Sequence, residues 1–146
     1  MLSQEQIQHR IERFPAMCRE AGLKVTPQRS ALYAMLAGAE NHPSPEEVYG
    51  ALRKTHPSIS LATVYKILDL FHARGYVRRV SSLERVRRYD ARTEPHHHAI
   101  CSACGKIQDV SAEALGVSTP SIPEGLGFAV EGFEILFHGL CESCGG

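Results

Sequence analysis

The sequence lacks a hydrophobic run of the roughly 18 residues that a membrane-spanning helix needs. Its first residues lack a basic region followed by an apolar stretch, so we expect no secretory signal peptide. The chain also lacks an even number of cysteines, because five are present and a framework of disulfides would leave one over. Together these absences favour a reducing, cytoplasmic setting in which thiolates bind metal.

The net charge is zero, yet the two parts of the chain carry opposite charge. Residues 1–88 hold 14 Lys and Arg against 8 Asp and Glu, whereas residues 89–146 hold 2 against 8. Such an asymmetry predicts a basic domain that meets an anionic polymer and an acidic domain with another role. We therefore expect two small domains rather than one.

The most specific motif is a pair of Cys-x-x-Cys turns separated by 36 residues. Each turn directs two thiolates at one cation, and two turns supply the four ligands of a closed tetrahedral zinc site. The predicted structural zinc ligands are Cys101, Cys104, Cys141 and Cys144. Cys18 lies outside both pairs, and we expect it to be a small apolar residue on a buried helix face rather than a redox group.

Four helices are predicted in residues 1–75, each opened by a residue that can cap its first turn. The expected N-caps are Ser3, Thr26, Ser44 and Ser60. Pro15 inside the first segment predicts a kink or two short helices. The third helix is expected to end near His56, and the fourth to run from Leu61 to Ala73 before Gly75.

Beyond the fourth helix, residues 76–80 and 86–89 are predicted to form two short strands joined by residues 81–85. Short helices followed by a basic hairpin are typical of a winged helix-turn-helix, whose recognition helix reads the DNA groove while the arginines of the wing clamp phosphates. The candidate DNA-binding residues are Lys24, Thr63, Tyr65, Lys66, Arg78, Arg79, Arg87 and Arg88, with Arg85 as a further wing arginine. The alternative is a solvated basic face. No aromatic stacking platform is evident, which favours double-stranded DNA over RNA.

A second metal site is indicated next to the first cysteine pair. Residues 95–101 are predicted to form a strand, in which His96 and His98 share one face and His97 takes the other. Asp90 lies just upstream of this strand, and Asp109 lies in a segment expected to pair with it. Two imidazoles with carboxylates suit Fe(II), Mn(II) or Zn(II) better than copper.

Each of these residues has a simpler interpretation. Asp90, at the end of the predicted wing, and Asp109 could be ordinary surface carboxylates. His97 is expected to face solvent or to support a ligand, and His42 taken alone reads as a loop histidine.

Taken in order, these residues resemble the ferric uptake regulator (Fur) superfamily of bacterial metal-dependent repressors. The motifs that carry the resemblance are residues 23–29 (LKVTPQR), His42-Pro43, residues 60–65 (SLATVY), Gly75 and residues 96–106 (HHHAICSACGK). The resemblance runs from about Gly22 to Cys144 and implies an α+β chain with three parts. These are a winged-helix DNA-binding domain (1–89), a hinge (90–95) and a small α/β dimerisation domain with the four-cysteine zinc (96–146).

The resemblance also implies a regulatory metal at the hinge, to which the DNA-binding domain contributes one histidine. Its implied ligands are His42, Asp90, His96, His98 and Asp109. Aspartate at positions 90 and 109 is similar to the peroxide-sensing PerR subfamily, whereas iron-sensing Fur proteins usually carry glutamate and zinc-sensing Zur proteins commonly use a cysteine. Residues 131–134 lack the histidine that many relatives use for a third metal site, and the dimerisation-domain helix within 111–127 should be short.

The function implied by the resemblance is that of a homodimeric repressor that binds an inverted-repeat operator with Fe(II) or Mn(II) bound. In the PerR subfamily, peroxide oxidises a ligand histidine, which here corresponds to His42 or His96, and the repressor leaves DNA. Three alternatives stay open: an iron sensor without peroxide chemistry, a DNA-binding module with zinc alone, and a metallohydrolase using His96, His98 and Asp90. Because no general base is evident and a hydrolase would leave the basic half unexplained, we expect no enzyme.

Overall fold

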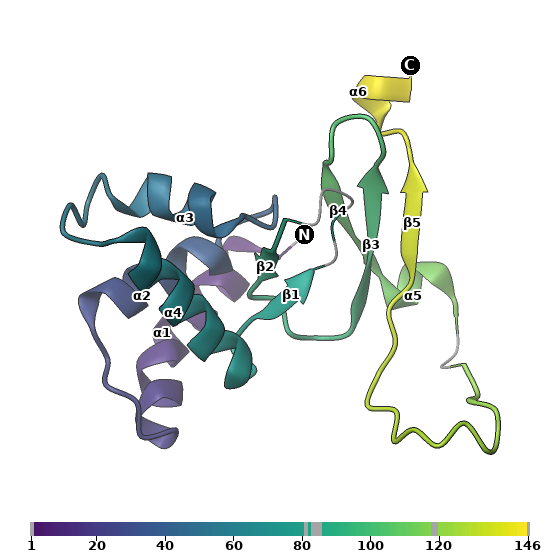
Figure 1. Cartoon of the computed structure of the whole chain (residues 1–146), viewed down its shortest axis with the longest axis horizontal. Helices are drawn as coiled ribbons and strands as arrows, with labels where there is room; N and C mark the ends of the chain where they lie inside the picture. The colour runs from purple at the N-terminus through teal and green to yellow at the C-terminus, as the bar shows by residue number, and fades with distance from the viewer. Residues whose placement is uncertain (1, 81, 83–85, 118–119, 146) are drawn as a thin grey trace. The chain divides into compact units, whose positions relative to one another are not determined.

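In the computed structural model of the chain, residues 2–80, 82, 86–117 and 120–145 are described (Figure 1). They divide into two compact units, Met1–Thr93 and Glu94–Gly146. The boundary falls inside residues 90–95, whose role as a hinge stays a prediction. The mixture of helices and small sheets confirms the predicted α+β class. Among the described residues, no helix has the length and hydropathy of a membrane span.

The first unit begins with helix α1, Gln4–Glu20. Its predicted N-cap is confirmed, since the Ser3 hydroxyl accepts a hydrogen bond from the backbone N–H of Gln6 at 3.2 Å. The helix continues across Pro15, so the prediction of two short helices is wrong. Phe14 and Cys18, before and after Pro15 in the helix, are fully buried. The free energy of this burial offsets the loss of the backbone hydrogen bond that proline removes.

Three further helices follow: α2 (Pro27–Ala37), α3 (Pro45–Leu52) and α4 (Leu61–Ala73). Each predicted N-cap side chain accepts a backbone N–H, which confirms all three starts. Helix α3 ends four residues before the predicted His56, and isolated turns follow it. The residue before a proline avoids helical backbone, so Pro57 draws the chain out of the helix ahead of His56.

An aromatic cluster forms the centre of this unit. The ring of Phe14 stacks on Tyr33 at 4.3 Å and meets Phe71 edge-on at 5.3 Å. Tyr76 closes the cluster, and its hydroxyl donates to the carbonyl of Met17 at 2.9 Å. Cys18 is buried beside it, and burial raises the pKa of its thiol, as expected for a residue used for packing.

The predicted wing is present as two antiparallel strands, β1 (Arg78–Val80) and β2 (Arg88–Asp90), with Arg78 opposite Asp90. Both strands are shorter than predicted. Residues 81 and 83–85 of the predicted connection, including the candidate Arg85, lie outside the described residues.

The second unit is a three-stranded sheet with strand β3 (His96–Cys101) in the middle (Figure 1). Strand β4 (Ile107–Ser111) pairs antiparallel to β3, and β5 (Leu136–Gly139) pairs parallel to it. Helix α5 (Ala112–Leu115) has four residues, in agreement with the expected short helix, and α6 (Glu142–Gly145) follows β5. The parallel pairing brings residues near 135 next to the histidine strand.

Candidate metal centres

The four paired cysteines meet at one end of the sheet in the second unit. Their sulfur atoms all lie within 4.8 Å of one another, and the sulfurs of Cys104 and Cys141 are 3.7 Å apart. In a tetrahedron with Zn–S bonds of about 2.3 Å, neighbouring sulfurs lie about 3.8 Å apart. The cluster therefore fits a structural zinc ion, as predicted.

Local backbone geometry aims these thiols at one point. Gly105 adopts φ of +71°, and its N–H donates to the carbonyl of Cys101, which closes the first Cys-x-x-Cys turn. The N–H of Cys141 donates to the sulfur of Cys101 at 3.3 Å. Hydrogen bonds from the backbone N–H groups of Cys141 and Cys104 lower the pKa of Cys101 to about 6. A thiolate is thus already favoured at the position where zinc needs one.

Cys144 has the opposite tendency. Hydrogen bonds to the thiols of Cys141, Cys104 and Cys101 raise its pKa to about 12. The last of four adjacent thiols is hard to ionise unless a cation compensates the accumulated negative charge. A divalent ion supplies that compensation.

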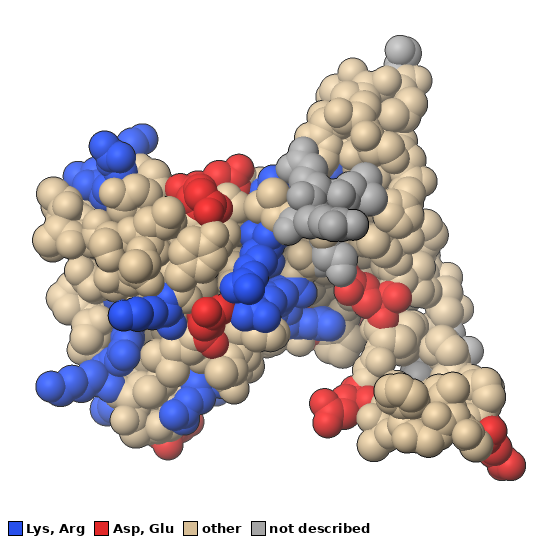
Figure 2. Space-filling view, in the orientation of Figure 1, with Lys and Arg blue, Asp and Glu red and all other residues tan. Residues whose placement is uncertain are grey.

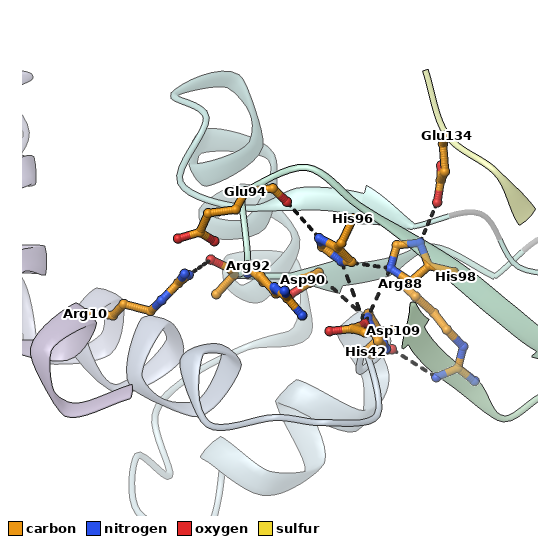
Figure 3. Close-up of polar contacts among 11 residues, drawn as sticks. Arg10, His42, Arg88, Asp90, Arg92, Glu94, His96, His98, Asp109 and Glu134 are labelled. Atoms are coloured by element: carbon orange, nitrogen blue, oxygen red, sulfur yellow. Dashed lines mark hydrogen bonds and ion pairs between the residues drawn. The ribbon is translucent and has the colours of Figure 1, made fainter. Parts of the chain in front are cut away.

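A second group of ligand atoms lies on the face shared by β3 and β4 (Figure 3). The Nε2 atoms of His96 and His98 are 3.1 Å apart, and each lies 3.7 Å from Oδ1 of Asp109. Two ligands held about 2.1 Å from one ion at angles of about 90–109° are about 3.0–3.4 Å apart. The two histidine nitrogens lie within this range, and Asp109 lies 3.7 Å from each, slightly beyond it. The mixed nitrogen and oxygen donors of this triad suit a divalent transition metal.

The Nδ1 atoms of both histidines turn away from the triad to oxygen partners. Nδ1 of His96 lies 2.8 Å from the carbonyl oxygen of Glu94, and Nδ1 of His98 lies 2.5 Å from the carboxylate of Glu134 (Figure 3). Such contacts select the tautomer in which Nε2 carries the lone pair that can bind a metal. Glu134 was not predicted, because its spacing from His98 carries no motif. The available signal was an acidic residue just before a strand that pairs with β3.

His97 lies on the other face of β3, as the alternation predicts. The expectation that it faces solvent is wrong, since its side chain is buried. The N–H of Ile135 donates to its Nδ1 at 3.1 Å, and the ring of Phe133 lies 5.5 Å away. His97 therefore packs the segment before β5 onto the sheet and belongs to neither ligand group.

The first unit contains a smaller ligand pair. Nε2 of His42, in the loop between α2 and α3, lies 3.5 Å from Oδ2 of Asp90 at the end of β2. The other carboxylate oxygen of Asp90 accepts the N–H of Arg92 at 2.7 Å. His42 and Asp90 thus present one nitrogen and one oxygen ligand from the first unit.

The predicted DNA-binding residues are distributed over the first unit, where Lys and Arg side chains gather (Figure 2). Lys24 and Lys66 are exposed, and Arg78 is half-buried. Thr63 and Tyr65 lie in the first turns of α4: Thr63 contacts its N-cap Ser60, and the Tyr65 hydroxyl donates to Glu46 at 2.7 Å.

The other wing arginines have carboxylate partners. Arg79 contacts Asp69 of α4 at 2.7 Å, and Arg87 lies 3.8 Å from the same carboxylate. The Arg88 side chain is 17% exposed and contacts Glu47. Of these three, Arg87 is the most accessible to a phosphate.

Comparison with known proteins gives a consistent result. The family model described as the ferric uptake regulator family matches residues 20–138. The peroxide-responsive repressor PerR of Staphylococcus aureus is 34% identical over 140 residues, which are 96% of this chain and 95% of that protein.

Solved structures agree in fold. The Helicobacter pylori ferric uptake regulator superposes with a TM-score of 0.73 at 24% identity, over 99% of this chain and 97% of that chain. An iron-bound ferric uptake regulator from Francisella tularensis gives a TM-score of 0.67 at 28% identity, over 84% of this chain and 95% of that chain.

Proposed function

Because the chain belongs to the ferric uptake regulator family of metal-responsive transcriptional regulators, we propose that it is a peroxide-responsive repressor whose DNA binding requires a regulatory metal. The observation that carries this proposal is the triad of His96, His98 and Asp109, which holds three metal-ligand atoms together on one face of the sheet. The relative from Staphylococcus aureus, itself a peroxide-responsive repressor, supports the finer assignment.

The ligands that we propose for the regulatory ion come from both units. The triad leaves coordination positions open, and the pair of His42 and Asp90 offers a nitrogen and an oxygen to fill two of them. Three imidazoles and two carboxylates then leave one position for a sixth ligand. With ligands from both units on one ion, metal binding would restrict the orientation of the first unit relative to the second.

Metal binding regulates DNA affinity by shifting a population. The ion binds tightly to the arrangement in which all five ligands reach it, and this arrangement is the one that presents α4 to the DNA groove. Each tenfold preference of the ion for that arrangement contributes about 1.4 kcal/mol toward it.

The proposed partners are a second copy of the chain and a DNA operator. The second unit exposes large apolar side chains, among them Phe128 and Leu140, and a second copy of the chain covers them in a homodimer. Two copies of the basic first unit then read the two halves of an inverted-repeat operator in the cytoplasm. The protein acts as a regulator and has no enzymatic activity.

The ligand set also supports peroxide sensing. When the bound metal is Fe(II), it supplies the one-electron chemistry that breaks the O–O bond of hydrogen peroxide. An imidazole C–H bond of His42 or His96 receives one oxygen atom, and the other oxygen leaves as water. The ring loses two electrons overall and peroxide gains two. The oxidised histidine would be a poorer ligand, so the protein would lose its affinity for the metal and then for DNA, whereas Mn(II) would support repression without this reaction.

The test compares protein loaded with Fe(II) and with Mn(II), each mixed with a DNA duplex and treated with hydrogen peroxide. DNA binding and the masses of the peptides that contain His42 and His96 are measured together. We expect the iron form alone to leave DNA while one peptide gains one oxygen atom. If the iron form binds and releases DNA only as Fe(II) is titrated, with unchanged peptide masses, the protein is an iron sensor without peroxide chemistry.

A further inference from the structure

Arg88, in wing strand β2, makes its contacts within the protein. Its Nη1 atom donates to the carbonyl oxygen of His42 at 3.2 Å and to the carboxylate of Glu47 at 3.1 Å. Its side chain is 17% exposed, whereas that of the neighbouring Arg87 is 54% exposed. A guanidinium with two internal partners and little exposure is poorly placed to bind a phosphate.

The residue that Arg88 contacts has an unfavourable backbone. His42 adopts φ of +49° and is the one non-glycine residue in the described part of the chain with a positive φ. Left-handed backbone is costly for a residue with a Cβ atom, and the following Pro43 restricts His42 further. Such a conformation persists when surrounding contacts hold it, and it is common at functional sites.

Strand β2 supplies those contacts together with the start of α3. The N–H of Tyr89 donates to the carbonyl of Pro43 at 3.2 Å, directly beside the bond from Arg88 to His42. The carboxylate of Glu47 that contacts Arg88 also accepts the N–H of Ser44 at 2.7 Å. The carbonyls of His42 and Pro43 are thus both hydrogen-bonded to strand β2. The last residue of that strand is the other candidate ligand, Asp90.

We infer that Arg88 is a positioning residue for the regulatory metal: it holds His42 at the distance from Asp90 at which both reach one ion. The inference rests on the proposed function, because it takes His42 and Asp90 as ligands. It assigns to Arg88 a role in metal affinity that is independent of DNA, in place of the phosphate contact expected from the sequence.

The experiment measures Mn(II) dissociation constants without DNA, on full-length protein that retains its zinc. Arg88→Ala is compared with Arg87→Ala, which removes an adjacent and more exposed arginine. Groups that orient metal ligands typically change affinity by about 10- to 100-fold, so Arg88→Ala should weaken Mn(II) binding within that range. Arg87→Ala should bind Mn(II) as the parent protein does.

Two further variants separate the possible failures. Arg88→Lys keeps the charge but loses the guanidinium geometry, so it should also weaken Mn(II) binding, and it serves if Arg88→Ala does not fold. His42→Ala tests the proposed ligand itself. Unchanged Mn(II) affinity in His42→Ala would overturn the ligand assignment and hence the proposed regulatory site. A loss in His42→Ala with parent-like affinity in both Arg88 variants would overturn the role of Arg88 alone.

Discussion

The two ring nitrogens of His98 have different partners, and this difference determines which nitrogen can bind a metal. Nε2 faces His96 at 3.1 Å, while Nδ1 contacts the Glu134 carboxylate at 2.5 Å. A carboxylate that accepts Nδ1–H fixes the tautomer and makes Nε2 a stronger donor to a metal. His96 has a neutral carbonyl at the equivalent position, so the two histidines are unequal ligands.

We expect Glu134→Gln to weaken Mn(II) binding about tenfold, because an amide supports the imidazole less strongly than a carboxylate. Isothermal titration with Mn(II) measures the effect. Glu131→Gln removes the same charge from the same segment without the contact to His98 and should leave the affinity unchanged. Equal affinities for the two variants would show that Glu134 does not support the ligand.

At the scale of single residues, the sequence predicted those groups whose members lie close together along the chain. Two histidines two apart on a strand share a face, and each Cys-x-x-Cys turn gathers two thiols, so both groups followed from short-range geometry. Glu134 and the internal role of Arg88 did not, because each depends on strand pairing or a loop contact between distant positions. From its charge alone, Arg88 was predicted to contact a DNA phosphate or solvent. Its side chain is instead largely buried and contacts His42 and Glu47 within the protein.

Helix starts in the first unit are set by capping side chains, and one of them also adjoins a candidate ligand. Ser44 caps α3 in a reciprocal box with Glu47, two residues after His42. The same Glu47 carboxylate contacts Arg88, so the start of this helix and the loop before it share one hydrogen-bond network.

We expect Ser44→Ala to reduce the free energy of unfolding by about 1 kcal/mol, the usual loss when a helix cap is removed. It should also weaken Mn(II) binding, because the N–H of Glu47 loses the Ser44 hydroxyl that helps to fix the start of α3 beside the loop. Urea unfolding and Mn(II) titration measure the two effects. Ser60→Ala at the start of α4 is the matched control, with a similar stability loss and parent-like Mn(II) affinity; equal Mn(II) affinities would contradict the coupling.

Element boundaries were predicted less well than element types. All four N-caps were found because capping depends on residues within one turn. The end of α3 was placed too late, and α1 was expected to kink or to divide into two short helices at Pro15. The α1 error arose because burial in the folded unit stabilises the helix across Pro15. The α3 error arose because Pro57 restricts the backbone of the residue before it. A local hydrophobic pattern shows neither effect.

The two units differ in how they are stabilised. The first has a continuous core that includes Phe14, Leu32, Val64 and Phe71. In the described part of the second, the buried apolar residues are Ile100, Cys101 and Ile107. A sheet with so small a core relies on its zinc, whose binding contributes about 10 kcal/mol in comparable small domains.

Removal of zinc by a strong chelator should therefore unfold the second unit and leave the first folded. Circular dichroism should retain most of its helical signal, because α1 to α4 lie in the first unit. Amide signals of β3 to β5 should disappear from NMR spectra, and zinc added with a reductant should restore them. Loss of the signals from both units together would contradict independent stabilisation.

The basic first unit should contribute most of the salt dependence of DNA binding. Lys66→Ala, at an exposed position of α4, should reduce the slope of log affinity against log salt by about one, as expected for one lost phosphate contact. Lys106→Ala removes an exposed lysine from the second unit and should leave the slope unchanged. Fluorescence anisotropy with a labelled duplex at several salt concentrations measures both, and equal slopes would argue against α4 as the DNA-reading helix.

Strand β3 carries candidate ligands of both metal centres within six residues, from His96 to Cys101. Zinc binding at Cys101 holds the end of this strand in position. In a molecule without zinc, His96 and His98 therefore have no fixed position. Zinc supply would then set an upper limit on how many molecules can respond to iron or peroxide. Under the proposed function, a cell short of zinc would lose repression as if it were short of iron, although its iron content had not changed.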